Sequence, residues 1–514
     1  MGKVGYFAIF LAFIATVQSQ SCNSRTVDYG IVCVCNASYC DTVPALEELS
    51  SGQYQLYTTS KNNAGFSTSI GTFSNATDSA SVTVTVSNLS STHQTIIGFG
   101  GAFTDATGIN IVILSEAAQE HLLQSYYGEN GIQYSIGRVP IGGTDYSTRG
   151  YTYCDNEDET LESFALQEED FNYKIPIIQR ALELRNGQEN LLLYASVWSA
   201  PLWMKTNDAY SGKGKVQTKY LELWAQYFLK FFDAYAENDI SFWGVTTQNE
   251  PENGITGIVI PNNGFTAPEM ADWIKNYMGP AIRNSSYSSL KIIAHDDNRA
   301  LLPVLSEVVL SDDDALHYID GIGLHWYTDF ITPATVLNMA SSSKKELFRL
   351  STEACTGYFA IEGLDIPIRL GSWDRGQDYI SSIMTHLEYD FIGWTDWNMA
   401  LNTTGGPNYI DNPVDSPIIV NATSDEFYKQ PMFYGLGHFS KFIVPGSVRI
   451  DIELSGLNTL YNIHALAFLR PDGKVAVVLN NRSGSSKTIK VNILGSTQIL
   501  SLDGNSLNTL LYTV

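Results

Sequence analysis

Two stretches of the sequence decide the fold that we predict: Thr246-Thr247-Gln248-Asn249-Glu250-Pro251 and Leu347-Phe348-Arg349-Leu350-Ser351-Thr352-Glu353-Ala354-Cys355. Each closes a short, strand-like run and carries a glutamate at its end, Glu250 or Glu353. In a parallel (β/α) barrel the carboxyl ends of all the strands meet at one rim, so residues far apart in the sequence become neighbours. A pair of carboxyl groups at such a rim is the arrangement that glycosidases use to cleave glycosidic bonds.

Strand-like runs of β-branched or apolar residues recur from about residue 95, separated by longer amphipathic stretches such as 221–232. The runs cover residues 95–100, 135–140, 191–196, 242–247, 291–295, 322–327, 347–350 and 391–395. A doubly wound open sheet shows the same alternation, but no glycine-rich dinucleotide fingerprint opens the first unit. We therefore predict an α/β fold, a (β/α)8 TIM barrel.

The chain is longer than one hydrophobic core requires. It has 514 residues, whereas single cores stop growing near ~250–300 residues. From about residue 448 the sequence turns into short β-rich runs, such as 473–480 and 487–494, punctuated by Gly, Ser and Asn. Residues 79–86 alternate polar and apolar side chains. We expect an antiparallel β-domain that combines strands from before and after the barrel.

The amino terminus is typical of a secretory signal: Met1-Gly2-Lys3 precedes an apolar stretch over residues 4–17 and a polar end. Cysteines agree with this compartment, because Cys22, Cys33, Cys35 and Cys40 lie within a short segment that has no histidine nearby. An oxidising compartment favours disulfides over zinc for such a cluster. The spacing alone leaves three pairings open.

The net charge of −24 limits the partners of the protein. A nucleic-acid-binding protein needs a basic face to hold phosphates, so we expect no nucleic acid partner. The charge is explained equally by a solvated acidic surface or by an acidic working compartment. Near the sequence pI of about 4.6 the net charge falls toward zero, and repulsion from anionic lipid fades.

The residues around Glu250 suit sugar chemistry. Pro251 ends the strand and fixes the exit turn, while Asn249 is placed to hydrogen-bond a sugar 2-hydroxyl. Aromatic residues lie at or just beyond the predicted strand ends, where they can stack on sugar rings. Core packing is the better explanation for any single one, but six at the same predicted rim favour a sugar site. They are Trp198, Trp203, Trp326, Tyr327, Trp394 and Trp397.

Longer motifs give the sequence a family resemblance over nearly its whole length. They occupy residues 32–40, 98–105, 138–140, 249–251, 325–327, 369–376, 393–398, 414–420 and 427–443. With these motifs the chain resembles the acid β-glucosidases, or glucosylceramidases, of glycoside hydrolase family 30. The resemblance implies a retaining mechanism that releases glucose from glucosylceramide, and we expect it to need no metal and no cofactor.

The resemblance also implies a role for each site residue. Glu353 becomes the nucleophile, and Glu250 the general acid and then the general base. The implied sugar-binding residues are Asp145, Trp198, Asn249 and Trp397, with Asn412 approaching the same pocket and His325 and Tyr327 at its rim. Arg138 is expected near Glu353, where a cation favours the ionised carboxylate. A purely structural ion pair is the alternative for Arg138.

Disulfides and domain limits follow from the same resemblance. It implies that Cys22 pairs with Cys33 and Cys35 with Cys40. The expected divisions are a signal peptide at 1–19, a small Cys-rich N-terminal subdomain at 22–45 packing with about 398–431, a β-sandwich from 46–91 and 447–514, and the barrel from 92–397 and 432–446. Candidate glycosylation sites begin at Asn36, Asn75, Asn88, Asn284, Asn402, Asn421 and Asn481.

Two loops depart from the pattern of the family. Residues 254–261 lack an expected aromatic pair, and residues 356–368 form a longer loop. Both border the side where the aglycone leaves, so cleavage of other β-glucosides or β-xylosides remains an alternative, and an inactive carbohydrate-binding paralogue is a third. As partners we expect membrane glucosylceramide, a saposin-type activator protein and anionic lipid. We expect the protein in the lysosomal lumen or secreted.

Overall fold

The computed structural model describes residues 19–77, 79–358 and 366–513. The predicted signal peptide, apart from residue 19, and the middle of the loop 356–368 lie outside this range. Among the described residues, no helix has the length and apolar character needed to cross a membrane.

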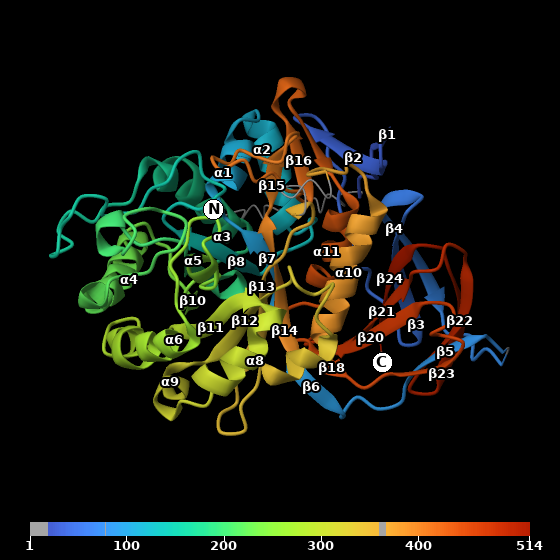
Figure 1. Cartoon of the computed structure of the whole chain (residues 1–514). Helices are drawn as coiled ribbons and strands as arrows, with labels where there is room; N and C mark the ends of the chain where they lie inside the picture. Colours follow the sequence, from blue (N-terminus) through green and yellow to red (C-terminus); the bar gives the residue numbers. More distant parts are fainter. Residues whose placement is uncertain (1–18, 78, 359–365, 514) are drawn as a thin grey trace, which may run out of the picture.

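Parallel strands close into a barrel at the centre of the molecule (Figure 1). In chain order they are β7 (Gly98–Ala102), β8 (Ile136–Ile141), β9 (Leu192–Val197), β10 (Gly244–Thr246), β11 (Lys291–Asn298), β12 (Gly321–His325), β13 (Phe348–Glu353) and β14 (Phe391–Asn398). Each coincides with one of the predicted runs, and β14 pairs with β7. The barrel prediction is confirmed, and the open sheet is excluded because the ring is closed.

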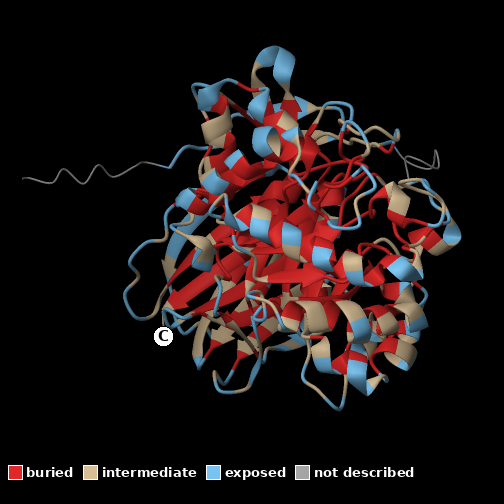
Figure 2. Ribbon diagram, turned by 90° about the vertical axis from the view of Figure 1, so that its left-hand side faces the viewer, coloured by how far each residue is buried: buried red, intermediate tan, exposed pale blue. Residues whose placement is uncertain are grey.

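Helices surround the barrel, which is why strands such as β8 are buried along their whole length. They are α1 (Asp105–Val112), α2 (Glu116–Tyr127), α3 (Ile175–Leu184), α4 (Leu221–Ala236), α5 (Asn253–Thr256), α6 (Ala267–Trp273), α7 (Gly279–Arg283), α8 (Leu302–Val304), α9 (Asp313–Tyr318), α10 (Trp373–Glu388) and α11 (Pro431–Ser440). The predicted helix at 221–232 is α4. Figure 2 shows the buried strands at the centre and exposed faces on the outer helices.

The β-sandwich stacks two sheets over a separate apolar core. The larger sheet has the order β4 (Asn63–Thr72), β3 (Gln53–Ser60), β24 (Ser506–Thr513), β21 (Lys474–Asn481), β20 (Ile463–Leu469), β18 (Val448–Ile450) and β6 (Thr92–Thr95). The smaller has β19 (Glu453–Gly456), β5 (Val82–Val86), β22 (Lys487–Ile493) and β23 (Ser496–Leu502). All pairs are antiparallel except β5 with β22.

Helix α11 connects the sandwich to the barrel. It packs against β7 of the barrel and against β3, β4 and β24 of the sandwich (Figure 1). Its His438 is fully buried and hydrogen-bonds Thr509 of β24 and Thr59 of β3. Because burial lowers the pKa of His438 to about 3, the imidazole is neutral and can serve one hydroxyl as donor and the other as acceptor.

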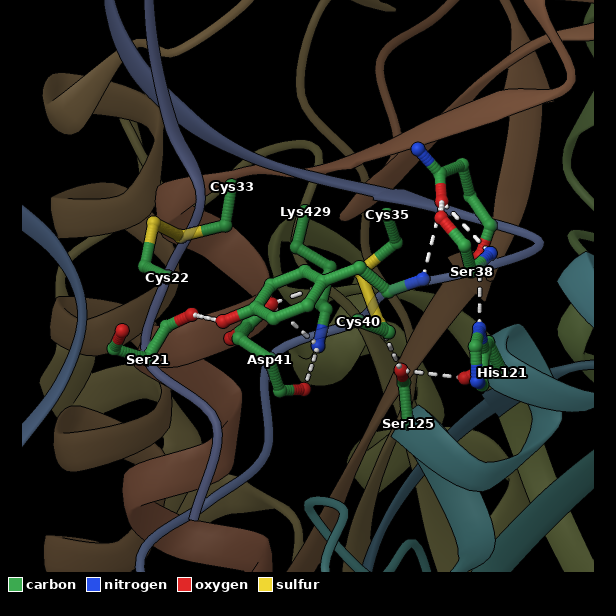
Figure 3. The surroundings of a disulfide bond; sticks show 12 residues. Ser21, Cys22, Cys33, Cys35, Ser38, Cys40, Asp41, His121, Ser125 and Lys429 are labelled. Carbon is green, nitrogen blue, oxygen red and sulfur yellow. Dashed lines mark hydrogen bonds and ion pairs between the residues drawn. A yellow bond between two sulfur atoms is a disulfide. The ribbon is translucent and has the colours of Figure 1, made fainter.

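A third sheet joins the Cys-rich amino terminus to an excursion that follows the last barrel strand. Its order is β1 (Ser24–Val27), β2 (Gly30–Asn36), β17 (Glu426–Lys429), β16 (Ile418–Asn421) and β15 (Ala400–Asn402). Cys22 bonds Cys33, and Cys35 bonds Cys40, as the resemblance implies (Figure 3). A buried pair between Lys429 and Asp41 at 2.9 Å ties the two segments together.

Candidate active site

The barrel brings Glu250 and Glu353 together. Glu353 is the last residue of β13, and Glu250 lies in the loop after β10. One carboxylate oxygen of each glutamate lies within 4.8 Å of the other, and both side chains are buried. Retaining glycosidases hold their carboxyl groups ~5–5.5 Å apart and inverting ones ~6.5–9.5 Å apart. The separation here belongs to the retaining class.

Both oxygens of Glu353 accept hydrogen bonds. The Arg138 guanidinium donates to Oε2, and the Tyr327 hydroxyl donates to Oε1 at 2.7 Å. Burial raises the pKa of Glu353 above its usual value, while the charges of His325 and Arg138 and the Tyr327 hydrogen bond oppose that rise. These donors fix the direction of the carboxylate and favour its ionised form.

Glu250 sits in a strained segment with partners on both oxygens. His325 Nδ1 lies 2.9 Å from Oε1, and the Asn253 amide donates to Oε2 at 2.6 Å. Glu250 has a φ of 39°, a left-handed conformation that side chains other than glycine and asparagine rarely adopt. Such strain persists only where the surroundings hold it, and it concentrates at functional sites.

His325 carries a positive charge between carboxylates. Its Nε2 lies 3.0 Å from Asp296, opposite the Nδ1 contact with Glu250. Burial alone would lower the pKa of His325, but Glu353, Asp296 and Glu250 together raise it to about 10. The imidazolium form donates from both nitrogens, to the Asp296 carboxylate and to Oε1 of the Glu250 carboxyl group.

Asp296 completes this network, and the sequence analysis missed it. It is fully buried and accepts hydrogen bonds from Arg138 at 2.8 Å, from His325 at 3.0 Å and from Ser196 at 2.7 Å. Although burial opposes the shift, Arg138 and His325 lower the pKa of Asp296. The sequence does contain a feature that could have identified Asp296: it directly follows the predicted strand run 291–295, and catalytic residues of barrels lie at the carboxyl ends of strands.

Two tryptophans and an aspartate form the other wall of the site. The rings of Trp198 and Trp397 are stacked 5.0 Å apart, and the Arg138 guanidinium lies over them at 4.8 and 5.5 Å. Arg138 also donates to the Asn249 side chain at 2.8 Å. Arg138 lies within β8 and Trp397 within β14, while Trp198 follows β9 and Asn249 lies in the loop after β10.

Asp145 belongs to the same wall. It lies in the loop after β8 and accepts a hydrogen bond from Asn412 at 3.0 Å. Burial and the nearby Glu353 raise the pKa of Asp145 to about 7. The carboxyl group is therefore protonated at acid pH, where it can both donate to and accept from a sugar hydroxyl.

Two predicted rim aromatics pack elsewhere. Trp394 is fully buried and donates to Ser382 of α10, while Trp203 packs on Tyr220 and donates to the Cys154 carbonyl. For these two rings, packing against the protein is what the structure shows. Successive side chains of a strand point to opposite faces, so proximity to a strand end does not fix which way a ring faces.

The loop after Glu250 is held by an unusual lysine, Lys205. Its ammonium donates to Ser199 Oγ at 3.0 Å, to the Tyr210 carbonyl at 3.1 Å and to the Asn262 carbonyl at 2.6 Å. Among the described residues, no neighbouring carboxylate contributes to the electrostatics of this ammonium. Burial lowers the pKa of Lys205 to about 7. Within the loop, Ile258 and Val259 are exposed.

Glu250, His325 and Glu353 are close enough for their ligand atoms to contact one ion. A metal would, however, meet the positive charges of His325 and Arg138, and both nitrogens of His325 already face carboxylates. A metal-ligating histidine must be neutral. The donor set therefore does not fit a metal centre.

The predicted glycosylation sites differ in exposure. Asn75, Asn88 and Asn284 are exposed, whereas Asn36, Asn402 and Asn421 are half-buried. Asn481 is fully buried, and its amide nitrogen donates to the carbonyls of Ser485, Leu502 and Asp503. A glycan needs this nitrogen, so we do not expect Asn481 to be glycosylated in the folded protein.

Comparison with known protein families identifies the two main domains of the chain. Residues 96–443 match the glycosyl hydrolase family 30 TIM-barrel domain, and residues 446–510 match the family 30 beta sandwich domain. The chain belongs to glycosyl hydrolase family 30. It is therefore a glycoside hydrolase, and family 30 enzymes are retaining glycosidases.

Similar proteins in family 30 extend over nearly the whole chain. The lysosomal acid glucosylceramidase of Mus musculus is 42% identical over 496 residues, covering 95% of this chain and 94% of that protein. Putative glucosylceramidase 4 of Caenorhabditis elegans is 40% identical over 517 residues, covering 98% of each. The structure of SrfJ from Salmonella typhimurium has a TM-score of 0.81 at 24% identity, covering 90% of this chain and 100% of that one, and shows the same fold.

Proposed function

We propose that the protein hydrolyses glucosylceramide to glucose and ceramide, with Glu353 as nucleophile and Glu250 as acid and base. The observation that carries the proposal is the pair of buried carboxyl groups within 4.8 Å of each other at the rim of the barrel. Two relatives that align with 95% and 98% of the chain, at 42% and 40% identity, are named a glucosylceramidase and a putative glucosylceramidase. Their names support the choice of substrate.

In the first step, the Glu353 carboxylate attacks the anomeric carbon while Glu250 gives its proton to the glycosidic oxygen. Ceramide leaves, and glucose stays bound to Glu353 as an ester. In the second step, Glu250 takes a proton from water, which attacks the anomeric carbon and frees Glu353. Glu353 suits the first role because the hydrogen bonds from Arg138 and Tyr327 hold its carboxylate in one direction.

The remaining site residues bind glucose or position the two glutamates. We assign Asp145, Asn249, Trp198, Trp397 and Asn412 to the glucose hydroxyls and ring, because they line one wall beside the pair. Arg138, His325 and Tyr327 hold the carboxyl groups through the contacts described above.

The partners and location follow from a lipid substrate. A protein that reaches a membrane lipid from the lumen needs help, so we expect a saposin-type activator and anionic lipid. The signal-like residues 1–19 and the paired cysteines support entry into the secretory pathway. We propose the lysosomal lumen as the destination, in line with the mouse relative's name.

A second candidate is cleavage of other β-glucosides. The endo-1,6-beta-D-glucanase neg1 of Aspergillus fumigatus is 28% identical over 431 residues, and its name gives a β-linked glucose polymer as its substrate. The divergent loop 254–261 lies directly behind Glu250, where the leaving group departs. Hydrolysis rates for glucosylceramide in anionic vesicles, an aryl β-glucoside and an aryl β-xyloside distinguish the two. Turnover of the aryl β-glucoside without turnover of glucosylceramide would favour the second candidate, and a xyloside preference would overturn both.

The roles of the glutamates are tested by substitution and trapping. Glu353→Gln should abolish turnover, and a 2-deoxy-2-fluoroglucoside should label the wild-type peptide that contains Glu353. Glu250→Gln should slow substrates with poor leaving groups far more than activated aryl glucosides, because only the former need a proton. Glu183→Gln, on an exposed helix end, is the control. Full activity in Glu353→Gln would refute the mechanism, and an inactive wild type would favour a carbohydrate-binding paralogue.

A further inference from the structure

A small cavity of about 110 Å³ lies beside the segment that follows Glu250. Its wall is largely apolar and includes Phe265, Met270, Leu305 and Val309. Three polar side chains also line it: Glu252, His295 and Asp297. Asp296, which lies between His295 and Asp297 in the sequence, instead accepts hydrogen bonds from Arg138 and His325. The end of β11 therefore places Asp296 in the catalytic network, and His295 and Asp297 in the wall of the cavity.

The polar atoms of this cavity are acceptors. His295 is 6% exposed, and its Nε2 lies 3.1 Å from the Asn298 carbonyl. A carbonyl only accepts, so Nε2 carries the hydrogen and Nδ1 is a bare acceptor in the neutral ring. Burial lowers the pKa of His295 to about 4, which keeps the ring neutral. Within the described part of the chain, Nδ1 has no hydrogen-bond partner.

Two carboxyl groups share the cavity, and neither is paired with a cation among the described residues. Asp297 is 2% exposed and accepts only backbone and amide hydrogens, from Asn298 at 2.7 Å and from the Glu252 N–H at 3.4 Å. Of the residues that the structure describes, no lysine or arginine lines the cavity. A ligand must therefore supply hydrogen-bond donors, and a positive charge on it is favoured by both carboxylates.

We propose that this cavity is a second ligand site that binds a small protonated alkylamine. The ammonium group lies among Asp297, Glu252 and His295 Nδ1, and the carbon chain packs against Phe265, Met270 and Leu305. A cavity of ~150 Å³ holds a benzene molecule, which has six non-hydrogen atoms, so the present volume suits an amine of about four or five non-hydrogen atoms. This assignment is independent of the glutamate roles proposed above.

The amine cavity shares its backbone segments with the catalytic residue Glu250. Glu250, His295 and Asp296 have φ values of 39°, 78° and 51°, all left-handed, and the Glu250 N–H donates to the Asp296 carbonyl at 3.0 Å. Pro251 and Glu252 continue from Glu250 into the cavity wall. A ligand that bridges Glu252 and Asp297 holds these two strained strand ends together.

The affinity should depend on pH. Burial and the neighbouring Glu250 raise the pKa of Asp297 to about 7, while His325 opposes the rise. Glu252 and His295 are the other titratable groups that line the cavity. Below about pH 7 Asp297 takes up a proton and its attraction for an ammonium weakens. Binding should therefore be stronger at pH 8 than at pH 5.5.

The test measures binding of n-butylammonium to the full-length enzyme by ligand-observed NMR at pH 8, with saturating glucose to occupy the catalytic site. We expect a dissociation constant on the order of 1 mM. Asp297→Asn should weaken it by about tenfold or more, and Val304→Trp, at an exposed lining position, should block it sterically. Asp313→Asn, at a distant exposed ion pair, is the matched control.

Several outcomes would overturn the proposal. One is equal binding of n-butylammonium to wild type, Asp297→Asn and Val304→Trp; another is equal binding of n-butyrate, which has the same chain and the opposite charge. Displacement of the amine by glucose would place it at the catalytic carboxylates instead. If Asp297→Asn fails to fold, Val304→Trp still decides, because it alters only a side chain that is 51% exposed.

Discussion

Replacing Asp296 by asparagine should damage both stability and catalysis, although Asp296 does not belong to the catalytic pair. The change keeps the shape of the side chain and removes its charge. Arg138 and His325, at 2.8 and 3.0 Å, then lose their shared counter-ion in a fully buried site. Breaking a buried ion pair from one side costs about 3–5 kcal/mol, and this figure is our expected loss of unfolding free energy.

The catalytic loss should exceed what instability explains. Arg138 and His325 hold Glu353 and Glu250 respectively, and misplacing a reacting group by 1 Å costs about 100-fold in rate. We expect kcat/KM for an aryl β-glucoside to fall by about 100-fold, measured well below the unfolding temperature of the variant.

The control carries the same substitution at an exposed pair. Asp313→Asn removes the partner of Lys344, with both side chains more than half exposed, and surface pairs contribute about 0–1 kcal/mol. If Asp296→Asn matches Asp313→Asn in chemical denaturation and in kcat/KM, the network around Asp296 does not organise the site.

The remaining predictions concern single side chains. Tyr327→Phe removes the 2.7 Å hydrogen bond that lowers the pKa of Glu353, so the acid limb of the kcat/KM profile should move to higher pH and the rate should fall about 10-fold or more; an unmoved limb contradicts this. Asp145→Asn should raise KM for glucosides. The pKa of Asp145 is raised to about 7 in the native state, so the native protein keeps this proton to a higher pH than the unfolded chain does. The free energy of unfolding of the wild type should therefore decrease as the pH rises from about 4 to about 7. The asparagine variant should therefore gain stability relative to wild type across that window in thermal unfolding, and a constant difference refutes it. Lys205→Met leaves three acceptors without their donor and should raise KM more for glucosylceramide than for an aryl glucoside; equal changes contradict a role in holding the loop. Asn88→Gln should remove a glycan in mass spectrometry if Asn88 is occupied, whereas Asn481→Gln should leave glycan mass unchanged and destabilise the buried turn.

The periodic pattern of the sequence was enough to predict the barrel. Every predicted strand run overlaps a barrel strand, because a strand buried on both faces must be apolar throughout its length. The boundaries were less accurate: Thr95, placed in the first barrel strand, ends β6 and pairs with Val448 of the sandwich. Hydrophobic pattern alone does not say which sheet a strand joins.

The sequence indicated which residues lie close together near the strand ends, but it did not indicate which way each side chain points. Glu250, Glu353, Arg138 and Tyr327 lie together as expected, while Trp394 faces α10. Asp296 and Lys205 were missed because their importance lies in their partners. Those partners belong to other strands and loops, which the order of residues does not reveal.

By itself, the sequence determined the elements and the chemical groups at their ends, because strand and helix periodicity are local properties of the chain. Closure of the barrel decided the rest. It brought a carboxylate oxygen of Glu250 within 4.8 Å of one of Glu353, and it buried Arg138 and His325 among Asp296, Glu250 and Glu353. Burial and charge depend on neighbours contributed by distant segments, so the pKa values of this site belong to the tertiary structure alone.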